Sequence, residues 1–178
     1  MVQRKTSAKS AGKSSSRART RKQPEALMML KQDHEHVAHL FQEFEDADNP
    51  QEKQEIAQLI CSELTVHAEL EEELFYPEVQ KAIKDPDLIE EARVEHASLK
   101  QLIGDIQSKR PGEPQFDATV KVLSEYVKHH VQEEEQKLFR EVMRADLDLN
   151  AMAERMRERK AELMDEEGLT EEDIEQHS

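Results

Sequence analysis

Four long stretches of this 178-residue sequence carry apolar residues at every third or fourth position, the spacing of one face of an α-helix. This spacing predicts helices over residues 24–47, 51–83, 85–109 and 115–144. Clusters of turn-forming residues separate the stretches: Asp48-Asn49-Pro50, Asp85-Pro86 and Pro111-Gly112-Glu113-Pro114. Pro77 lies inside the second stretch, where we expect a kink or an early end of the helix.

The connections between these stretches are short, which favours antiparallel packing of neighbours in an up-down four-helix bundle. Residue usage agrees with this, because good helix formers such as Glu, Leu, Ala, Lys and Gln dominate and only 4 Gly are present. There is no Trp and there are five Phe, so the core must be built mainly from aliphatic side chains. We therefore expect an all-α fold.

A shorter, highly charged fifth helix is expected over residues 146–166, ended by Gly168. Its Met152, Met156 and Leu163 could dock on the bundle or on a second copy of it. The expected organisation has three parts. These are a disordered basic tail over 1–23, a four-helix bundle over 24–145, and a charged helix and tail over 146–178.

The charge of the chain is unevenly distributed. Residues 1–22 contain four Lys and four Arg with no acidic residue, and the remainder contains 17 basic and 40 acidic residues. The acidic body should repel nucleic acid, whereas the tail could contact nucleic acid or another acidic partner. The tail is equally consistent with a solubilising leader, and its composition weakly resembles an organellar transit peptide.

The single cysteine, Cys61, cannot form an internal disulfide, and no cysteine pair is available for a structural zinc or an iron-sulfur cluster. No apolar run approaches the roughly 18 residues that span a bilayer. We therefore expect a cytoplasmic protein without a membrane partner. The sequence leaves its oligomeric state open.

Four of the eight histidines form a two-fold pattern. His34 and His67 are 33 residues apart, His96 and His130 are 34 apart, and a glutamate follows each second member by four residues. These glutamates are Glu71 and Glu134. The pattern predicts two similar helical hairpins, each contributing His and then His-x-x-x-Glu.

All six residues continue the apolar faces of their helices, so we expect them to point inward. A glutamate in a core needs a compensating partner. One interpretation is a core in which histidines and glutamates satisfy each other by hydrogen bonds. The other, which six converging polar groups favour, is a ligand set for two divalent cations. Imidazole and carboxylate without thiolate suit iron, manganese or zinc. If both glutamates bridge, each cation keeps positions for exogenous ligands.

Several sequence segments resemble the hemerythrin-like HHE cation-binding domain. They are LKQDH at 30–34, VHAELEEELFYP at 66–77, VEHAS at 94–98 and KHHVQEEE at 128–135. The resemblance spans about residues 26–143 and is stronger to the bacterial hemerythrin-like group than to the oxygen carriers. It implies a four-helix bundle around two non-haem iron ions bridged by an oxide or hydroxide. The family's metal-ligand positions fall on the six residues already singled out: His34, His67, Glu71, His96, His130 and Glu134.

Some neighbouring residues leave choices open. Oxygen-carrying members have a fifth histidine one turn after the third ligand, where this chain has Lys100, which could reach water or orient a bound oxygen species. His36 and His39 are expected at the surface but could supply an extra ligand. Tyr76 and Tyr126 could orient ligands or simply pack. Glu72 and Glu73 are expected on a solvated face.

In the helix expected over residues 115–144, the pair His130–Glu134 is preferred to His129–Glu133, because Val127 lies on the same apolar face as His130.

The leading functional hypothesis is a di-iron binding protein that binds or reacts with oxygen, peroxide or a related small oxidant. Members of the family are associated with oxygen binding, oxygen or redox sensing, iron handling and peroxide breakdown. One alternative is an enzyme that dismutates hydrogen peroxide. Another is a structural or regulatory module whose metal only locks the bundle, acting through its tail or fifth helix.

Overall fold

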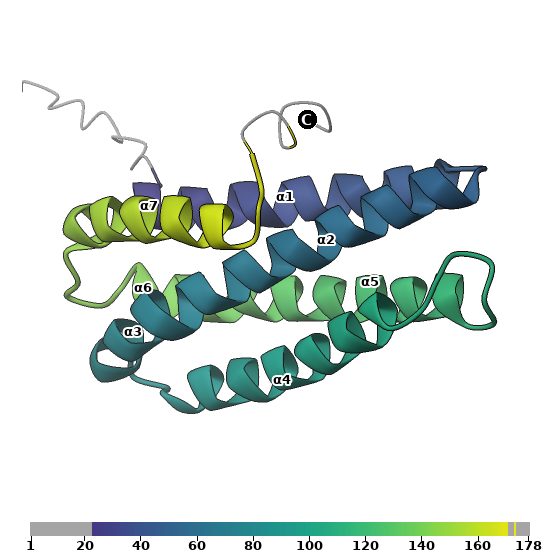
Figure 1. Cartoon of the computed structure of the whole chain (residues 1–178). Coiled ribbons are helices and arrows are strands. Elements are labelled where there is room, and N and C mark those ends of the chain that lie inside the picture. The colour runs from purple at the N-terminus through teal and green to yellow at the C-terminus, as the bar shows by residue number, and fades with distance from the viewer. Residues whose placement is uncertain (1–22, 171–172, 174–178) are drawn as a thin grey trace, which may run out of the picture.

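The computed structural model describes residues 23–170 and 173, and it is a four-helix bundle with one added helix (Figure 1). The first two stretches are α1 (Glu25–Asp46) and α2 (Pro50–Leu70), the latter continuing through the π-helical turn η1 (Glu71–Phe75) into α3 (Tyr76–Ala82). The others are α4 (Asp87–Gln107) and α5 (Phe116–Glu133), with α5 continuing through a second π-helical turn, η2 (Glu134–Leu138), into α6 (Phe139–Val142). Helix α1 packs on α2 and α5, and α4 packs on the same two helices. The expected all-α, up-down bundle is confirmed.

Local sequence explains where the helices start and turn. The side chain of Asn49 accepts a hydrogen bond from the Glu52 backbone N–H at 2.9 Å, and Pro50 occupies the first helical position of α2. In the α4–α5 connection, Gly112 and Gln115 adopt left-handed backbone conformations with φ of 86° and 76°. The predicted breaks at 48–50 and 111–114 therefore coincide with the observed loops.

The helix does not end at Pro77, contrary to one of the two outcomes expected there. It continues to Ala82, and the irregularity is the turn η1 immediately before the proline. In this turn the backbone N–H of Tyr76 donates to the carbonyl of Glu71, five residues back, and that of Phe139 donates to Glu134 in the same way in η2. Since η2 contains no proline, the proline alone does not explain the two turns. Both turns begin at a glutamate of the repeated His-x-x-x-Glu pattern.

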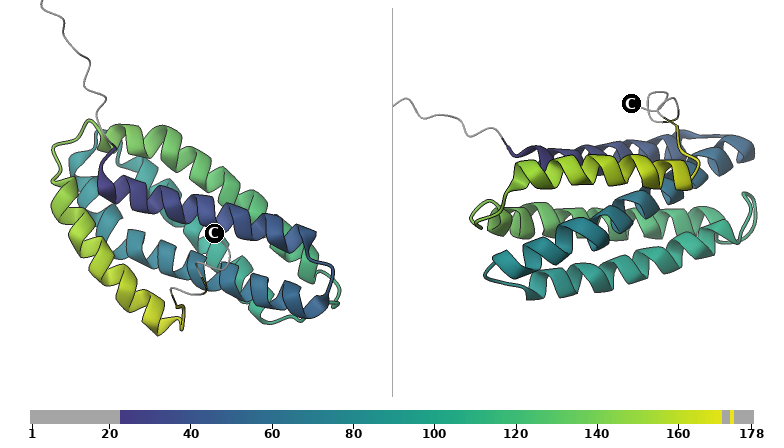
Figure 2. Two further views of the ribbon diagram at one scale, coloured as in Figure 1. Left: turned by 90° about the horizontal axis from the view of Figure 1, so that it is seen from above. Right: turned by 60° about the vertical axis from the view of Figure 1, so that its left-hand side comes forward.

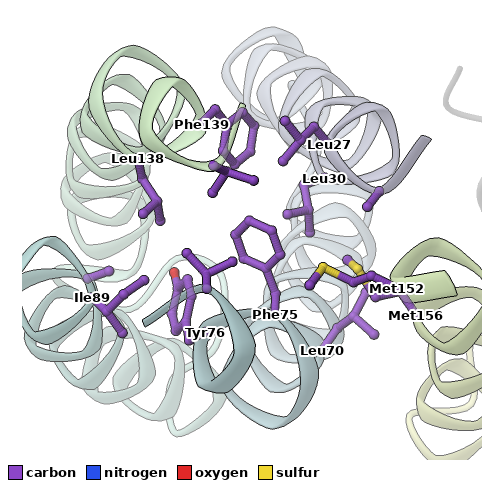
Figure 3. Close-up of a cluster of buried hydrophobic side chains, with 14 of the residues drawn as sticks. Leu27, Leu30, Leu70, Phe75, Tyr76, Ile89, Leu138, Phe139, Met152 and Met156 are labelled. Atoms are coloured by element: carbon purple, nitrogen blue, oxygen red, sulfur yellow. The ribbon is translucent and has the colours of Figure 1, made fainter. Parts of the chain in front are cut away.

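Two apolar clusters fill the bundle, one on each side of a polar layer. Figure 3 shows the first cluster, in which Phe75, Tyr76 and Phe139 point toward one another from two helical stretches. The second cluster lies toward the α1–α2 and α4–α5 loops and includes Ile60 and Leu123. On each long helix the predicted ligand lies between residues of the two clusters. The polar layer is therefore enclosed on both sides along the bundle axis.

The fifth helix, α7 (Leu149–Glu166), packs along α1 and α2 on the outside of the bundle (Figure 2). It starts three residues later than predicted, because Asp148 caps it by accepting a hydrogen bond from the Ala151 backbone N–H at 3.1 Å. Gly168, with φ of 72°, ends it as expected. Of the two docking surfaces considered for this helix, it covers the bundle of its own chain.

Among residues 23–170 and 173, no helix is long and apolar enough to cross a membrane. The basic tail predicted over 1–23 lies outside the described residues, except for Gln23.

Candidate metal centre

The six predicted ligands meet in the polar layer between the two apolar clusters. All of them are buried, each at most 6% exposed. The Nε2 atoms of His34 and His67 lie 3.2 Å apart, and those of His96 and His130 are also 3.2 Å apart. In each helical hairpin, one histidine of the pair comes from each helix. The two-fold pattern in the sequence therefore becomes two facing pairs of imidazoles.

Glu71 lies between the two histidine pairs. Its Oε2 atom is 3.5 Å from His67 Nε2 and 3.3 Å from His96 Nε2. Ligand atoms of His34, His67, Glu71 and Glu134 all lie within 4.8 Å of one another, and the same holds for Glu71, His96 and His130. The side chains thus form two possible cation-binding groups that share Glu71. Glu134 belongs to the first group alone, so the arrangement is less symmetric than the expected pair of bridging glutamates.

The buried carboxylates lack the partners that an ordinary core would give them. Among the described residues, Oε1 of Glu71 and Oε1 of Glu134 have no hydrogen-bond partner, and Oε2 of Glu134 has only the 3.3 Å contact with His34 Nε2. An unsatisfied buried acceptor is costly, on the order of 1–3 kcal/mol and more when charged. Two cations would satisfy these oxygens, and a set of imidazoles and carboxylates without thiolate fits iron, manganese or zinc.

The electrostatics of these side chains point the same way. Burial opposes ionisation of Glu71, but the imidazoles of His67, His96 and His130 outweigh it and hold the pKa of Glu71 well below its ordinary value. Burial and the negative charge of Glu71 raise the pKa of Glu134. Burial opposes the charged form of His34, yet the Glu134 and Glu71 carboxylates prevail and raise its pKa to about 9. Positive charge in this layer therefore stabilises the Glu71 carboxylate.

The outward-facing Nδ1 atom of each predicted ligand histidine lies close to a different carboxylate. The Nδ1-to-oxygen distances are 3.0 Å for His34–Glu135, 3.4 Å for His67–Asp33, 3.0 Å for His96–Glu72 and 2.8 Å for His130–Glu95. Such carboxylates fix the tautomer and orientation of a metal-binding imidazole. A proton on Nδ1 leaves the Nε2 lone pair directed into the site.

These outer carboxylates are ionised and paired again on their outer side. Burial alone would raise their pKa values, but hydrogen bonds from the histidines and the charge of neighbouring basic side chains lower the pKa values of all four. The outer ion pairs are Lys31–Glu135, Lys100–Glu72, His129–Glu95 and Lys160–Asp33. Each predicted ligand histidine is thus the inner end of a chain formed by imidazole, carboxylate and a basic side chain.

Sequence reasoning missed these carboxylates: Glu73 is exposed as expected, but Glu72 is partly buried beside the site. Glu72 binds His96 and Lys100 rather than facing solvent alone, and Glu73 pairs with Arg159 of α7 at 2.7 Å. A signal was available, because an acidic residue directly precedes His34 and His96 and directly follows Glu71 and Glu134. Lys100, which could have reached water or the site, pairs with Glu72 at 2.8 Å while staying 43% exposed.

Tyr76 is fully buried, and its hydroxyl donates a 2.8 Å hydrogen bond to Glu71 Oε2. The Tyr76 hydroxyl oxygen also lies 3.2 Å from His96 Nε2. Burial and the Glu71 carboxylate raise the pKa of Tyr76 well above its ordinary value, so it remains a proton donor. Tyr126, the other tyrosine considered, is 52% exposed and lies outside the site.

Among the other histidines that the structure describes, His39 and His129 are at the surface as expected, whereas the His36 side chain, also expected there, is only 13% exposed. His130 is 3% exposed, whereas the His129 side chain is 66% exposed, which confirms the chosen register. His36 pairs with Glu63 at 2.9 Å, and the half-exposed His39 lies 3.7 Å from Glu43. Neither belongs to the two possible cation-binding groups among the described residues.

Comparisons with known proteins agree with this architecture. Residues 26–142 match the family model described as hemerythrin HHE cation binding domain. The chain is 36% identical over 111 residues to a protein of Nostoc sp. strain PCC 7120 named DNA nickase; the match covers 62% of this chain and 31% of that protein. The chain therefore spans less than a third of this relative's length.

A crystal structure of a hemerythrin HHE cation-binding domain-containing protein from Mycobacterium kansasii has the same fold. It superposes with a TM-score of 0.69 at 21% identity, covering 78% of this chain and 86% of the other. The family match, the shared fold and the convergent histidines and glutamates lead to one conclusion. This chain belongs to the hemerythrin HHE cation-binding domain family.

Proposed function

We propose that the chain holds two non-haem iron ions and reacts with oxygen, peroxide or a related small oxidant. The observation that carries this proposal is the pair of buried ligand groups that share Glu71. Manganese or zinc would fit the same donor atoms. Iron is favoured because a pair of iron ions, once bound, would supply both an open coordination position and the electrons that reduce a small oxidant.

The two groups differ in a way that suggests where an oxidant would approach. The first group offers four residues, whereas the second offers Glu71, His96 and His130. Fewer protein ligands leave more positions for an exogenous molecule. The Tyr76 hydroxyl, 3.2 Å from His96 Nε2, lies on this side and can donate a hydrogen bond or a proton.

A small apolar cavity supports the same class of substrate. It adjoins all four predicted ligand histidines and is lined elsewhere mostly by apolar residues that include Leu64, Leu99 and Val127. Its volume of about 20 Å³ is about what a single water-sized molecule needs. The site thus suits a molecule of two or a few atoms, and the apolar lining limits water around it.

Metal analysis with an absorption spectrum of the aerobically purified protein tests the proposal. We expect two iron ions per chain and the near-ultraviolet absorption of an oxide-bridged iron pair. A colourless protein with two zinc ions would retain the site but reject the redox function. A protein with less than one bound transition metal per chain under metal-replete expression would overturn the proposal.

Adding hydrogen peroxide to the iron-loaded protein separates binding from catalysis. Sustained oxygen evolution over many turnovers would support the peroxide-dismutating enzyme. A single oxidation of the iron with no further evolution would support a binding or sensing protein. A bound metal that reacts with neither oxygen nor hydrogen peroxide, but raises the melting temperature, would support the module whose metal only locks the bundle.

A role on DNA is a second candidate, because a relative is named DNA nickase and residues 1–22 carry eight basic residues with no acid. The acidic remainder of the chain would confine DNA contact to that segment. Retention on DNA should then weaken between low and moderate salt and disappear when residues 1–22 are deleted. Nicking of supercoiled plasmid by the full chain would extend the proposal to cleavage, and salt-independent retention by the deletion variant would contradict it.

A further inference from the structure

We propose that Lys160 of α7 is a positioning residue for the predicted ligand His67, acting through Asp33. This inference rests on the proposed metal site. Helix α7 lies outside the matched family region 26–142, and through Lys160 it would contribute to that site. The link is a chain of three side chains that runs from the surface helix to the buried imidazole.

The Asp33 carboxylate is held from two sides. Its Oδ1 accepts a hydrogen bond from the Lys160 ammonium, and its Oδ2 lies 3.4 Å from His67 Nδ1. On the inner side of the ring, His67 Nε2 is 3.5 Å from Glu71 Oε2. The Asp33 side chain is only 14% exposed, and Lys160 and His67 are the side chains that contact its carboxylate. Lys160 therefore decides which way the Asp33 carboxylate faces.

Among the four outer carboxylates, Asp33 depends most on such support. The 3.4 Å distance between His67 and Asp33 is the longest of the four, the others being 2.8–3.0 Å. A longer contact is weaker and orients the ring less firmly on its own. Lys31 and Lys100 support two of the other carboxylates from α1 and α4, within the matched domain. His67 alone receives its supporting lysine from the added helix.

Helix α7 is well anchored and can hold Lys160 in place. Its Met152, Met156 and Leu163 are each at most 1% exposed and pack into the cluster shown in Figure 3. Figure 2 shows the helix lying along the outer face of the bundle beside α1. These apolar contacts do not involve Lys160 or Asp33, so we expect the helix to stay docked when the lysine charge is removed.

The surroundings of Lys160 allow substitution without overpacking. The pair lines a cavity of about 300 Å³ bounded by α1, α2 and α7, with Val66 and Met164 on its walls. Lys160→Gln removes the charge and keeps much of the side-chain length, and Lys160→Arg keeps the charge and fits the open space. Arg157→Gln is a matched control, because Arg157 lies on the same helix and pairs with Glu25, an exposed residue remote from the ligands.

The test uses the full chain loaded with iron and measures the rate at which a chelator removes the metal. Loss of an outer hydrogen-bonding group typically weakens metal binding by about 10- to 100-fold. Because Lys160 acts through Asp33, we expect Lys160→Gln to release iron about tenfold faster than wild type. Lys160→Arg should stay within about twofold of wild type, and Arg157→Gln should be indistinguishable from it.

A second measurement separates positioning from simple stabilisation. The rise in melting temperature on loading iron should shrink in Lys160→Gln and remain unchanged in Arg157→Gln. In an Asp33→Asn background, Lys160→Gln should have no further effect on iron release, since the residue it acts through is gone. Equal iron release by Lys160→Gln and Arg157→Gln would overturn the inference. Failure of the wild-type chain to bind two ions would instead overturn the proposed function, and this inference with it.

Discussion

The Tyr76 hydroxyl donates a 2.8 Å hydrogen bond to Glu71, the carboxylate that both possible cation-binding groups share. The equivalent position in the other half of the repeat is Phe139, which likewise follows a π-helical turn and stacks on His34 with ring centroids 6.2 Å apart. At this position the two halves of the repeat therefore differ by one hydroxyl group.

This difference makes Tyr76→Phe an informative variant. We expect it to keep both metal ions, because a phenyl ring already occupies the equivalent position in the other half. Oxidation of the ferrous protein by hydrogen peroxide should slow by about 100-fold if the hydroxyl donates a proton. Stopped-flow absorbance measures this rate. Tyr126→Phe, at an exposed position, is the control, and equal rates in the two variants would show that the Tyr76 hydroxyl takes no part in the reaction.

The glutamates should differ in their effect on metal content. Glu71→Ala should lose both ions, because both groups need this carboxylate, whereas Glu134→Ala should mainly weaken the ion held by His34 and His67. Glu72→Ala removes the carboxylate that orients His96 and pairs with Lys100, and should weaken binding by about 10- to 100-fold. Metal content after dialysis against a weak chelator measures the order. The exposed Glu125 provides the control through Glu125→Ala. Equal metal content in all four variants would contradict the assignment.

The metal-free protein should lose stability as the pH rises. The pKa of His34 is raised from 6.5 to about 9 in the folded chain, so protonated His34 stabilises the fold fully below about pH 6.5. This contribution is lost as the pH rises through about 9, and each pKa unit is worth about 1.4 kcal/mol. Thermal unfolding at pH 6.5 and 9 tests this. The iron-loaded protein should show a smaller drop, because its ligand imidazoles are already neutral, and an equal drop with and without iron would refute the explanation.

Docking of α7 should contribute substantially to stability. Met156 is fully buried against the bundle, and truncation of such a side chain typically costs about 2–5 kcal/mol. Met156→Ala should lower the free energy of unfolding by that amount in urea titrations. Met143→Ala, at a position 37% exposed, should cost much less. Equal losses for the two variants would mean that α7 detaches readily in solution.

Much of the bundle could be predicted from sequence, because apolar residues at helical spacing indicate both the helix and its buried face. Val127 marks the inner face of its helix, and this was enough to choose His130 over His129. The predicted helix boundaries at Pro50 and Gly168 also held, because proline fixes its own φ and glycine readily adopts the left-handed conformation that ends a helix. Local chemistry and periodicity thus determined the elements and the inward-facing residues.

The outer carboxylates and the π-helical turns could not be predicted in the same way. The chain has 29 Glu, so a glutamate beside a candidate ligand carries little information until its distance to Nδ1 is known. The turns at Glu71 and Glu134 depend on tertiary packing, and only one of the two is followed by a proline. The contact between Lys160 and Asp33 could not be predicted either. The two residues are 127 positions apart and come together only when α7 packs on the bundle.

Anomalous diffraction at the iron absorption edge from crystals of the iron-loaded protein tests the central claim most directly. We expect two peaks in the polar layer, one beside His34 and His67 and one beside His96 and His130, with the Glu71 carboxylate between them. A single peak on the protein surface, or no peak among these side chains, would contradict the account.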